Sequence, residues 1–125
     1  MPDRRLMSLI LAAATIAAAG AASALTTPGD PMRGKALYGV CMSCHSLDDN
    51  DVGPRHRGVV GRRAGAVPGF HYSPALAGSG LVWTPVNLDR WLSGPQALVP
   101  GARMFFSLSD AQKRADIIAY LATQN

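Results

Sequence analysis

Two cysteines and a histidine stand close together in the sequence, as Cys41-Met42-Ser43-Cys44-His45. This C-x-x-C-H spacing is the signature of covalent haem attachment. On one helical turn the two sulfur atoms point the same way, so each can bond a vinyl group of one porphyrin. His45 follows at the rotation that brings a ring nitrogen to the iron. The motif therefore predicts one haem c per chain, attached through Cys41 and Cys44 and ligated by His45.

The same residues are compatible with two other kinds of site. A C-x-x-C pair in an exported chain can form a redox disulfide, but a thioredoxin-like site needs a βαβ pattern that the flanking sequence does not have. Together with His45, the two thiols would supply part of a zinc site. His56 and His71 do not pair at a zinc-binding spacing, so haem attachment is the favoured prediction.

A second axial ligand is expected on the other side of the iron. Four methionines are unsuitable, because two belong to the N-terminal leader described below and two lie in or before the haem motif: Met1, Met7, Met32 and Met42. Met104 follows a Pro100-Gly101 turn in a later loop, which can bring its thioether to the far side. We predict Met104 as the second ligand, with His56 and His71 as alternatives.

The N-terminus has the pattern of an export signal. Arg4 and Arg5 are followed by an apolar stretch over residues 6–19 and by the small-residue site Ala22-Ser23-Ala24. We predict a signal peptide over residues 1–24 and one domain over residues 25–125, in the periplasm. The alternative is an uncleaved membrane anchor, although the apolar run of residues 6–22 is short for a membrane span and rich in alanine.

Charge and cysteine content exclude some functions. The chain has 12 Lys and Arg and 8 Asp and Glu, and residues 1–24 remove two of the former and one of the latter, which leaves a charge of +3. The basic residues are scattered, so nucleic-acid binding is not expected. Both cysteines belong to the motif, which leaves none for a structural disulfide.

Local signals predict an all-α fold. Asp30-Pro31 begins a helix that runs into the haem motif. Gly34 lies in the interior of this helix, where glycine is less stable than alanine. Residues 48–80 are rich in Gly and Pro and predict a long loop that encloses the cofactor. A second helix is expected between Thr84-Pro85 and Gly94-Pro95, followed by a loop over residues 96–106. A capping box over residues 109–112 predicts the start of the last helix.

Beyond these signals, the chain resembles class I, mitochondrial-type cytochromes c over nearly its whole length after the leader. The matching segments are Gly29-Asp30, Gly34-Lys35, the haem motif at 41–45, Gly53-Pro54, residues 58–62, residues 68–72, Trp83, residues 100–106 and residues 116–121. The resemblance implies terminal helices that cross, a haem in a crevice and iron ligation by His45 and Met104.

The resemblance also implies roles for other residues. Gly34 and Tyr38 would meet Ile117 and Tyr120 where the terminal helices cross. The Pro54 carbonyl would accept a hydrogen bond from the His45 ring, which fixes the ring and raises its basicity. A buried haem propionate would be hydrogen-bonded by Arg62, Tyr72 and Trp83, and Phe106 would lie near the exposed haem edge.

The chain departs from the mitochondrial pattern at Leu76, Trp91 and Ala102, where that pattern has asparagine, tyrosine and threonine. The family's polar network beside the methionine ligand is largely lost, so we expect a dry pocket and an altered reduction potential. A lysine-rich docking face is also absent.

The predicted activity is one-electron transfer without enzymatic catalysis. We expect a monomer that docks transiently on membrane or periplasmic redox proteins, steered to an acidic surface by arginines such as Arg33, Arg57 and Arg103. Two alternatives remain open. One is a dedicated electron-transfer subunit of a dehydrogenase, and the other is a haem peroxidase formed after loss of the methionine ligand.

Overall fold

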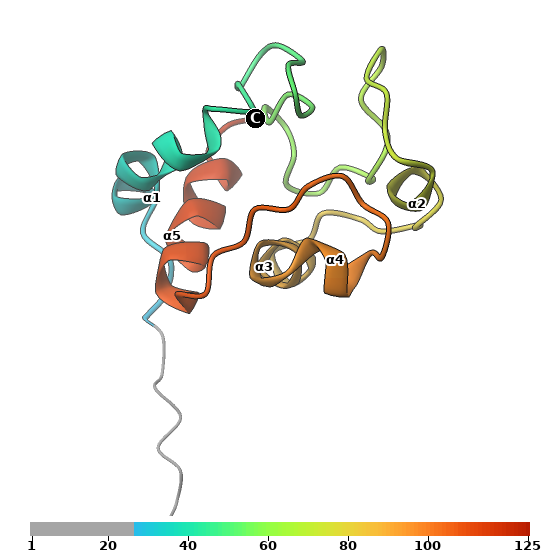
Figure 1. Cartoon of the computed structure of the whole chain (residues 1–125). Coiled ribbons are helices and arrows are strands. Elements are labelled where there is room, and N and C mark those ends of the chain that lie inside the picture. Colours follow the sequence, from blue (N-terminus) through green and yellow to red (C-terminus); the bar gives the residue numbers. More distant parts are fainter. Residues whose placement is uncertain (1–26) are drawn as a thin grey trace, which may run out of the picture.

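The computed structural model describes residues 27–125, which form a helical domain with long connections (Figure 1). In chain order its elements are α1 (Pro31–Leu37), the 3₁₀ helix η1 (Tyr38–Cys41), α2 (Pro74–Ala77), α3 (Pro85–Ser93), α4 (Pro95–Leu98) and α5 (Ala111–Ala122). Extended pairing in this part of the chain is limited to one isolated bridge, between Arg63 and Val82. The prediction of an all-α fold is confirmed.

The predicted signal peptide, residues 1–24, lies outside the described residues, as does the predicted first residue of the mature chain, Leu25. Among the helices of residues 27–125, none has the length and apolar character needed to cross a membrane.

Helices α1 and α5 lie side by side, although they come from opposite ends of the chain (Figure 1). Gly34 makes this approach possible, because a Cβ atom on it would lie 1.9 Å from the carbonyl oxygen of Asp116 and 2.8 Å from Cβ of Tyr120. One turn later the ring of Tyr38 packs on the ring of Tyr120, with centroids 5.2 Å apart. The expected meeting of Gly34 and Tyr38 with Tyr120 is confirmed, and it explains why an unfavourable helix residue stands at position 34.

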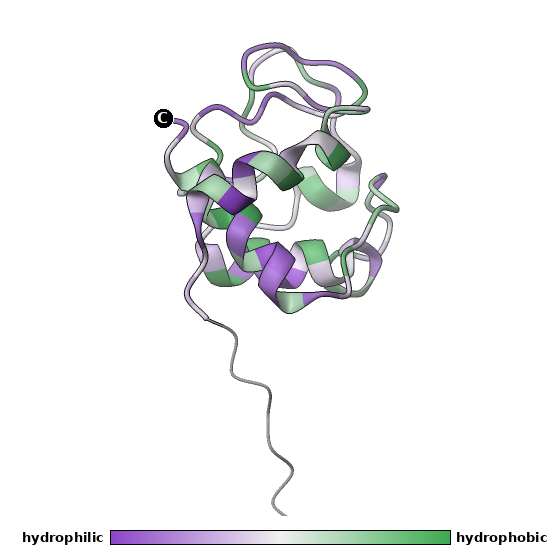
Figure 2. Cartoon of the chain, turned by 90° about the vertical axis from the view of Figure 1, so that its left-hand side faces the viewer, coloured by the Kyte–Doolittle hydropathy of each residue, from purple (hydrophilic) through white to green (hydrophobic). Residues whose placement is uncertain are grey.

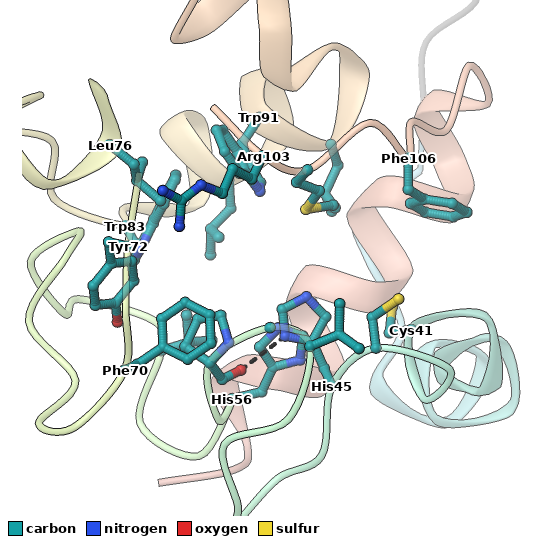
Figure 3. Close-up of a pocket in the computed structure, with 18 of the residues that line it drawn as sticks. Cys41, His45, His56, Phe70, Tyr72, Leu76, Trp83, Trp91, Arg103 and Phe106 are labelled. Carbon is teal, nitrogen blue, oxygen red and sulfur yellow. Dashed lines mark hydrogen bonds between the residues drawn. The ribbon is translucent and has the colours of Figure 1, made fainter. Parts of the chain in front are cut away.

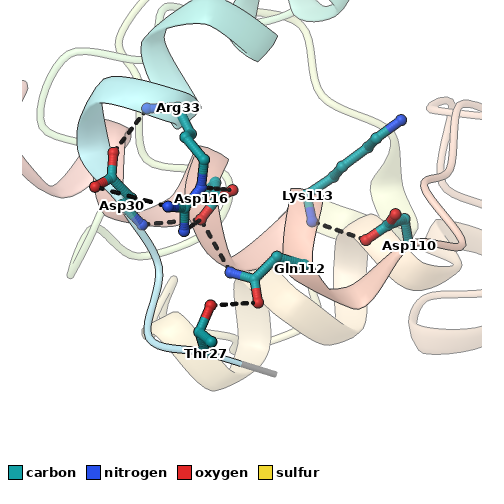
Figure 4. A network of polar contacts seen from close by, with 7 residues as sticks. All are labelled: Thr27, Asp30, Arg33, Asp110, Gln112, Lys113 and Asp116. Carbon is teal, nitrogen blue, oxygen red and sulfur yellow. Dashed lines mark hydrogen bonds and ion pairs between the residues drawn. The ribbon is translucent and has the colours of Figure 1, made fainter. Parts of the chain in front are cut away.

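A buried carboxylate joins the same two helices (Figure 4). Asp116 is 2 % exposed and accepts hydrogen bonds from the Asp30 backbone N–H at 2.9 Å and from Arg33 through Nε at 2.9 Å and Nη2 at 3.0 Å. The Gln112 side chain adds a third partner at 3.1 Å. Asp116 thus has the several charge-assisted bonds that a buried carboxylate requires.

Side-chain caps define where the helices begin. Asp30 accepts from the Arg33 N–H at 2.8 Å, and Thr84 accepts from the Asn87 N–H at 3.1 Å, as their sequence positions predict. The predicted capping box of the last helix is wrong. Asp110, not Ser109, is the N-cap of α5, and it accepts from the Lys113 N–H at 3.0 Å.

Two short helices occupy regions where the sequence predicts loops. α2 begins after Ser73, which caps it through the Leu76 N–H at 3.1 Å. α4 begins directly after α3, because Pro95 is compatible with the first position of a helix as well as with the end of one. Gly94 ends α3 as expected, and its own carbonyl then accepts from the Leu98 N–H at 3.1 Å.

The long segment between η1 and α2 is tied to distant parts of the chain. The Gly58 N–H donates to the Gln124 carbonyl at 2.7 Å, and the Gly61 N–H donates to the Trp83 carbonyl at 2.8 Å. Hydrophilic and hydrophobic residues are mixed along each helix (Figure 2). The apolar sides include Leu88, Trp91 and Leu92 of α3 and Ile117 of α5, all of which are buried.

Candidate functional site

A cavity of about 320 Å³ opens between the haem motif, α3, α5 and the segment that follows α4. Its size is in the range of small-molecule and cofactor sites. Every residue of the site predicted from the sequence lines it: Cys41, Cys44, His45, Pro54, Arg62, Tyr72, Trp83 and Met104. Most of the other lining side chains are apolar or aromatic, as a flat hydrophobic cofactor requires.

The haem motif forms a tight turn at one wall of this cavity. η1 ends at Cys41, whose carbonyl accepts from the Cys44 N–H at 3.2 Å and from the His45 N–H at 2.9 Å. Cys41 is partly buried at this wall, and Cys44 is exposed. Within residues 27–125 no cluster of three or more His, Cys, Asp or Glu side chains is placed to hold a metal ion, so the zinc alternative has no ligand set there.

The His45 ring is fixed by its neighbours. Its Nδ1 lies 2.7 Å from the Pro54 carbonyl oxygen, so the N–H is on Nδ1 and Nε2 carries the lone pair that an iron ligand needs. Burial lowers the pKa of His45, which also favours the neutral ring. Gly53 permits this arrangement, because a Cβ atom there would lie 2.1 Å from His45 Cε1. Pro54 is therefore positioned for the role that the resemblance implies.

His56 is a site residue whose place is not evident from the sequence. Its ring is stacked on the His45 ring, with centroids 3.9 Å apart and an angle of 21° between the planes. Two trans ligands approach an iron from opposite sides, so His56 in this position cannot be the ligand opposite His45. The other histidine considered for that role, His71, lines the cavity with an exposed side chain.

The opposite wall of the cavity is formed by α2, by α3 and by the segment after α4 (Figure 3). Trp91, Leu76 and Arg103 lie across the cavity from His45 and Cys41. Met104 directly follows Arg103, lines the same cavity and packs partly buried against the core. The Gln96 side chain donates to the carbonyls of Ala102 at 2.5 Å and Met104 at 3.0 Å. No sequence signal singles out Gln96.

The surroundings of Arg62 indicate whether the cavity can bind an anionic group. Its Nη2 donates to the Arg55 carbonyl at 2.8 Å and its Nη1 to the Arg57 carbonyl at 3.3 Å. Its Nε is buried, and no hydrogen-bond partner for it is found among the described residues. Burial lowers the pKa of Arg62. A half-buried cation with an unused donor beside Tyr72 and Trp83 fits a carboxylate such as a haem propionate.

The residues that depart from the mitochondrial pattern make the wall near Met104 apolar. Leu76 and Trp91 line the cavity, and Ala102 is 2 % exposed. The rings of Trp91 and Trp83 pack together, with centroids 5.1 Å apart. These side chains offer little for an internal water to bond, and the dry pocket stays a prediction.

The helical fold around a cavity with a C-x-x-C-H motif at its edge defines a c-type cytochrome. The sequence model of the cytochrome c family matches residues 31–125, and the chain belongs to this family. Accordingly it binds one covalent haem c, whose attachment motif contains Cys41 and Cys44, and it is an electron carrier of class I.

Similar proteins include several bacterial cytochromes c2. The chain is 50 % identical to cytochrome c2 of Rhodopila globiformis over an alignment of 100 residues that covers 77 % of this chain and 94 % of that protein. It is 46 % identical to cytochrome c2 of Rhodomicrobium vannielii over an alignment of 101 residues that covers 78 % of this chain and 81 % of that protein. Among solved structures, cytochrome cH from Methylobacterium extorquens superposes with a TM-score of 0.74 at 44 % identity, covering 76 % of this chain and 99 % of that one.

Proposed function

We propose that this protein carries single electrons between redox proteins of the periplasm, with His45 and Met104 as the axial ligands of its haem iron. The observation that carries the proposal is that two potential iron ligands from distant segments, His45 and Met104, line one cavity. Hydrogen bonds support both residues: the His45 ring bonds the Pro54 carbonyl, and the Met104 carbonyl accepts from Gln96. Haem c supplies reversible one-electron exchange between Fe(II) and Fe(III) when it is bound.

The chain's own residues set the conditions for this exchange. The Pro54 carbonyl orients His45 and raises its basicity, and the Met104 thioether favours the reduced state. Leu76 and Trp91 keep water from the Met104 side. His45 and Met104 would together hold the iron and leave no position for a substrate, so we assign no catalytic residue.

Docking is proposed at the edge of the cavity where apolar side chains are exposed. Phe105 and Val52 line the cavity and are 80 % and 72 % exposed. Arg103, two residues before Phe105, also lines the cavity and is exposed. This combination suits a brief contact between a monomer and an acidic partner, with an association rate that falls as ionic strength rises.

Delivery to the periplasm rests on the predicted signal peptide. We propose that residues 1–24 are removed and that residues 25–125 form the working protein. The test is cell fractionation with N-terminal sequencing of the purified protein, and a retained leader in the membrane fraction would contradict it.

Iron ligation is tested on protein that has been exported together with a haem-maturation system. The ferric spectrum is expected to show the weak long-wavelength band of a sulfur-ligated haem, and Met104→Ala is expected to abolish it and to allow turnover of peroxide. His71→Ala is the matched control and should retain the band. If the unmodified ferric protein lacks the band, the second ligand is not a thioether, and if Met104→Ala keeps the band, another methionine supplies it; either result contradicts the proposal.

A further inference from the structure

The segment that carries Met104 is held by few hydrogen bonds of its own backbone. The Ala102 N–H donates to the Val99 carbonyl at 3.0 Å, and the Leu108 N–H donates to the Leu92 carbonyl at 2.8 Å. Between these two points, no backbone–backbone hydrogen bond to any other described residue involves residues 103–107. Side chains must therefore define the path of this segment.

Gln96 is the side chain that does so beside Met104. It lies on α4, partly buried, and its Nε2 spans the carbonyls of Ala102 at 2.5 Å and Met104 at 3.0 Å. Both partners are acceptors, so the amide nitrogen must face them and the assignment of the amide is unambiguous. These two bonds close the Pro100-Gly101 turn against the helix from which the segment departs.

The base of this contact is rigid. Pro95 is buried, its carbonyl accepts from the Val99 N–H at 2.9 Å, and the Gly94 carbonyl accepts from the Leu98 N–H at 3.1 Å. α4 is short, but its fixed first turn limits the directions that the next side chain can take. Gln96 is thus preorganised to hold two consecutive points of the segment.

We propose that Gln96 is a positioning residue that latches the Met104 segment and so keeps the sixth coordination position of the iron closed. The inference rests on the proposed ligation by Met104. Withdrawal of Met104 requires its backbone to move away from α4, which breaks one or both bonds of the latch. Loss of the latch therefore lowers the cost of opening and makes the iron more accessible to an external ligand.

The test is titration of the ferric protein with imidazole, followed in the visible spectrum. Gln96→Glu keeps the size of the side chain but removes the donor and faces two carbonyl oxygens with a carboxylate. We expect it to bind imidazole at least about tenfold more tightly than the unmodified protein, since it loses two hydrogen bonds. Gln124→Glu is the matched control, because it is the same substitution near the C-terminus, where Gln124 Nε2 donates to the Thr123 hydroxyl at 2.9 Å in an exposed position.

Two further variants separate the latch from other causes. Gln96→Ala removes the donor without adding charge and should also bind imidazole more tightly, so it serves if Gln96→Glu does not fold. In a Met104→Ala background, Gln96→Glu should change the imidazole affinity less than twofold, because the ligand that the latch holds is gone. If Gln96→Glu acted only through a general loss of stability, it would change the imidazole affinity equally with Met104 present and in the Met104→Ala background.

The outcomes distinguish the two levels of the proposal. If Met104→Ala retains the sulfur band, the proposed ligation fails and the latch fails with it. If Met104→Ala loses the band while both Gln96 variants bind imidazole like the unmodified protein, the ligation stands and the latch is refuted.

Discussion

The rings of His45 and His56 lie face to face, with centroids 3.9 Å apart, and the second ring connects the first to the packing of the terminal helices. His56 Nδ1 is 2.9 Å from the hydroxyl of Tyr38, and Tyr38 in turn packs on Tyr120 of α5. Burial, together with His45 and Arg62, lowers the pKa of His56 to about 3, so the ring is neutral near pH 7. The histidine of the haem motif is thus supported through His56 by the contact between α1 and α5.

His56→Leu is expected to lower the free energy of unfolding by about 1–2 kcal/mol, because the buried Tyr38 hydroxyl loses its partner. Tyr38→Phe alone should cost a similar amount, and the double variant should cost less than the two together. Denaturant unfolding of the four proteins at pH 7 measures this coupling. Strictly additive effects would show that the hydrogen bond contributes nothing to stability.

Gly34→Ala should lower the free energy of unfolding by about 2–3 kcal/mol, because the new methyl group would overlap the Asp116 carbonyl and force α1 away from α5. Gly39→Ala is the matched control, since a Cβ atom at Gly39 meets no atom within 4 Å. It should be neutral or stabilise by about 0.5 kcal/mol through the unfolded chain. Equal losses in the two variants would mean that the close approach at Gly34 is not what limits this position.

Local signals explain how much of the architecture the sequence predicts. Asp30 and Thr84 each cap a helix by accepting from the backbone N–H three residues later. The spacing of Leu88, Trp91 and Leu92 follows the period of one helix face. Both features are local and need no tertiary information. The local sequence determines α4 and the cap at Asp110 less well. Pro95 and Ser109 are compatible with two local structures each, and packing decides between them.

The candidate site divides in the same way. The haem motif is contiguous, and the place of Met104 after the Pro100-Gly101 turn predicts the second ligand. The family resemblance supplies Pro54, Arg62, Tyr72 and Trp83, and these four residues and Met104 all line the cavity. The sequence offers His56 only as an alternative ligand and does not single out Gln96. Their contacts could not be predicted, because their partners lie 18 and 8 residues away and neither residue belongs to a pattern of recognisable spacing. Their roles exist only once the chain is folded.

Arg62→Met should lower the midpoint potential, because a half-buried positive charge at the cavity disfavours the additional positive charge of Fe(III). The expected shift corresponds to on the order of 1 kcal/mol in the redox free energy. Arg63→Met is the matched control, since the neighbouring arginine is exposed and does not line the cavity. Potentiometry of both variants measures the effect, and equal shifts would argue against a specific role for Arg62.

Asp116→Asn should destabilise the protein at pH 7 and progressively less as the pH falls. Arg33, the Asp30 N–H and Gln112 hold the pKa of Asp116 well below its ordinary value of 3.8. A carboxylate with a lowered pKa in the folded state stabilises that state at pH values above its unfolded pKa, and the stabilisation disappears as the pH falls below about 4 towards the lowered value. Urea unfolding at pH 7, 5, 4 and 3 should therefore show a gap between the two proteins that is constant down to pH 5 and then narrows.

Asp48→Asn, which removes an exposed ion pair with Arg57, should show a much smaller gap at pH 7. A gap for Asp116→Asn that stays constant down to pH 3 would mean that its hydrogen-bonding shape, and not its charge, joins α1 to α5.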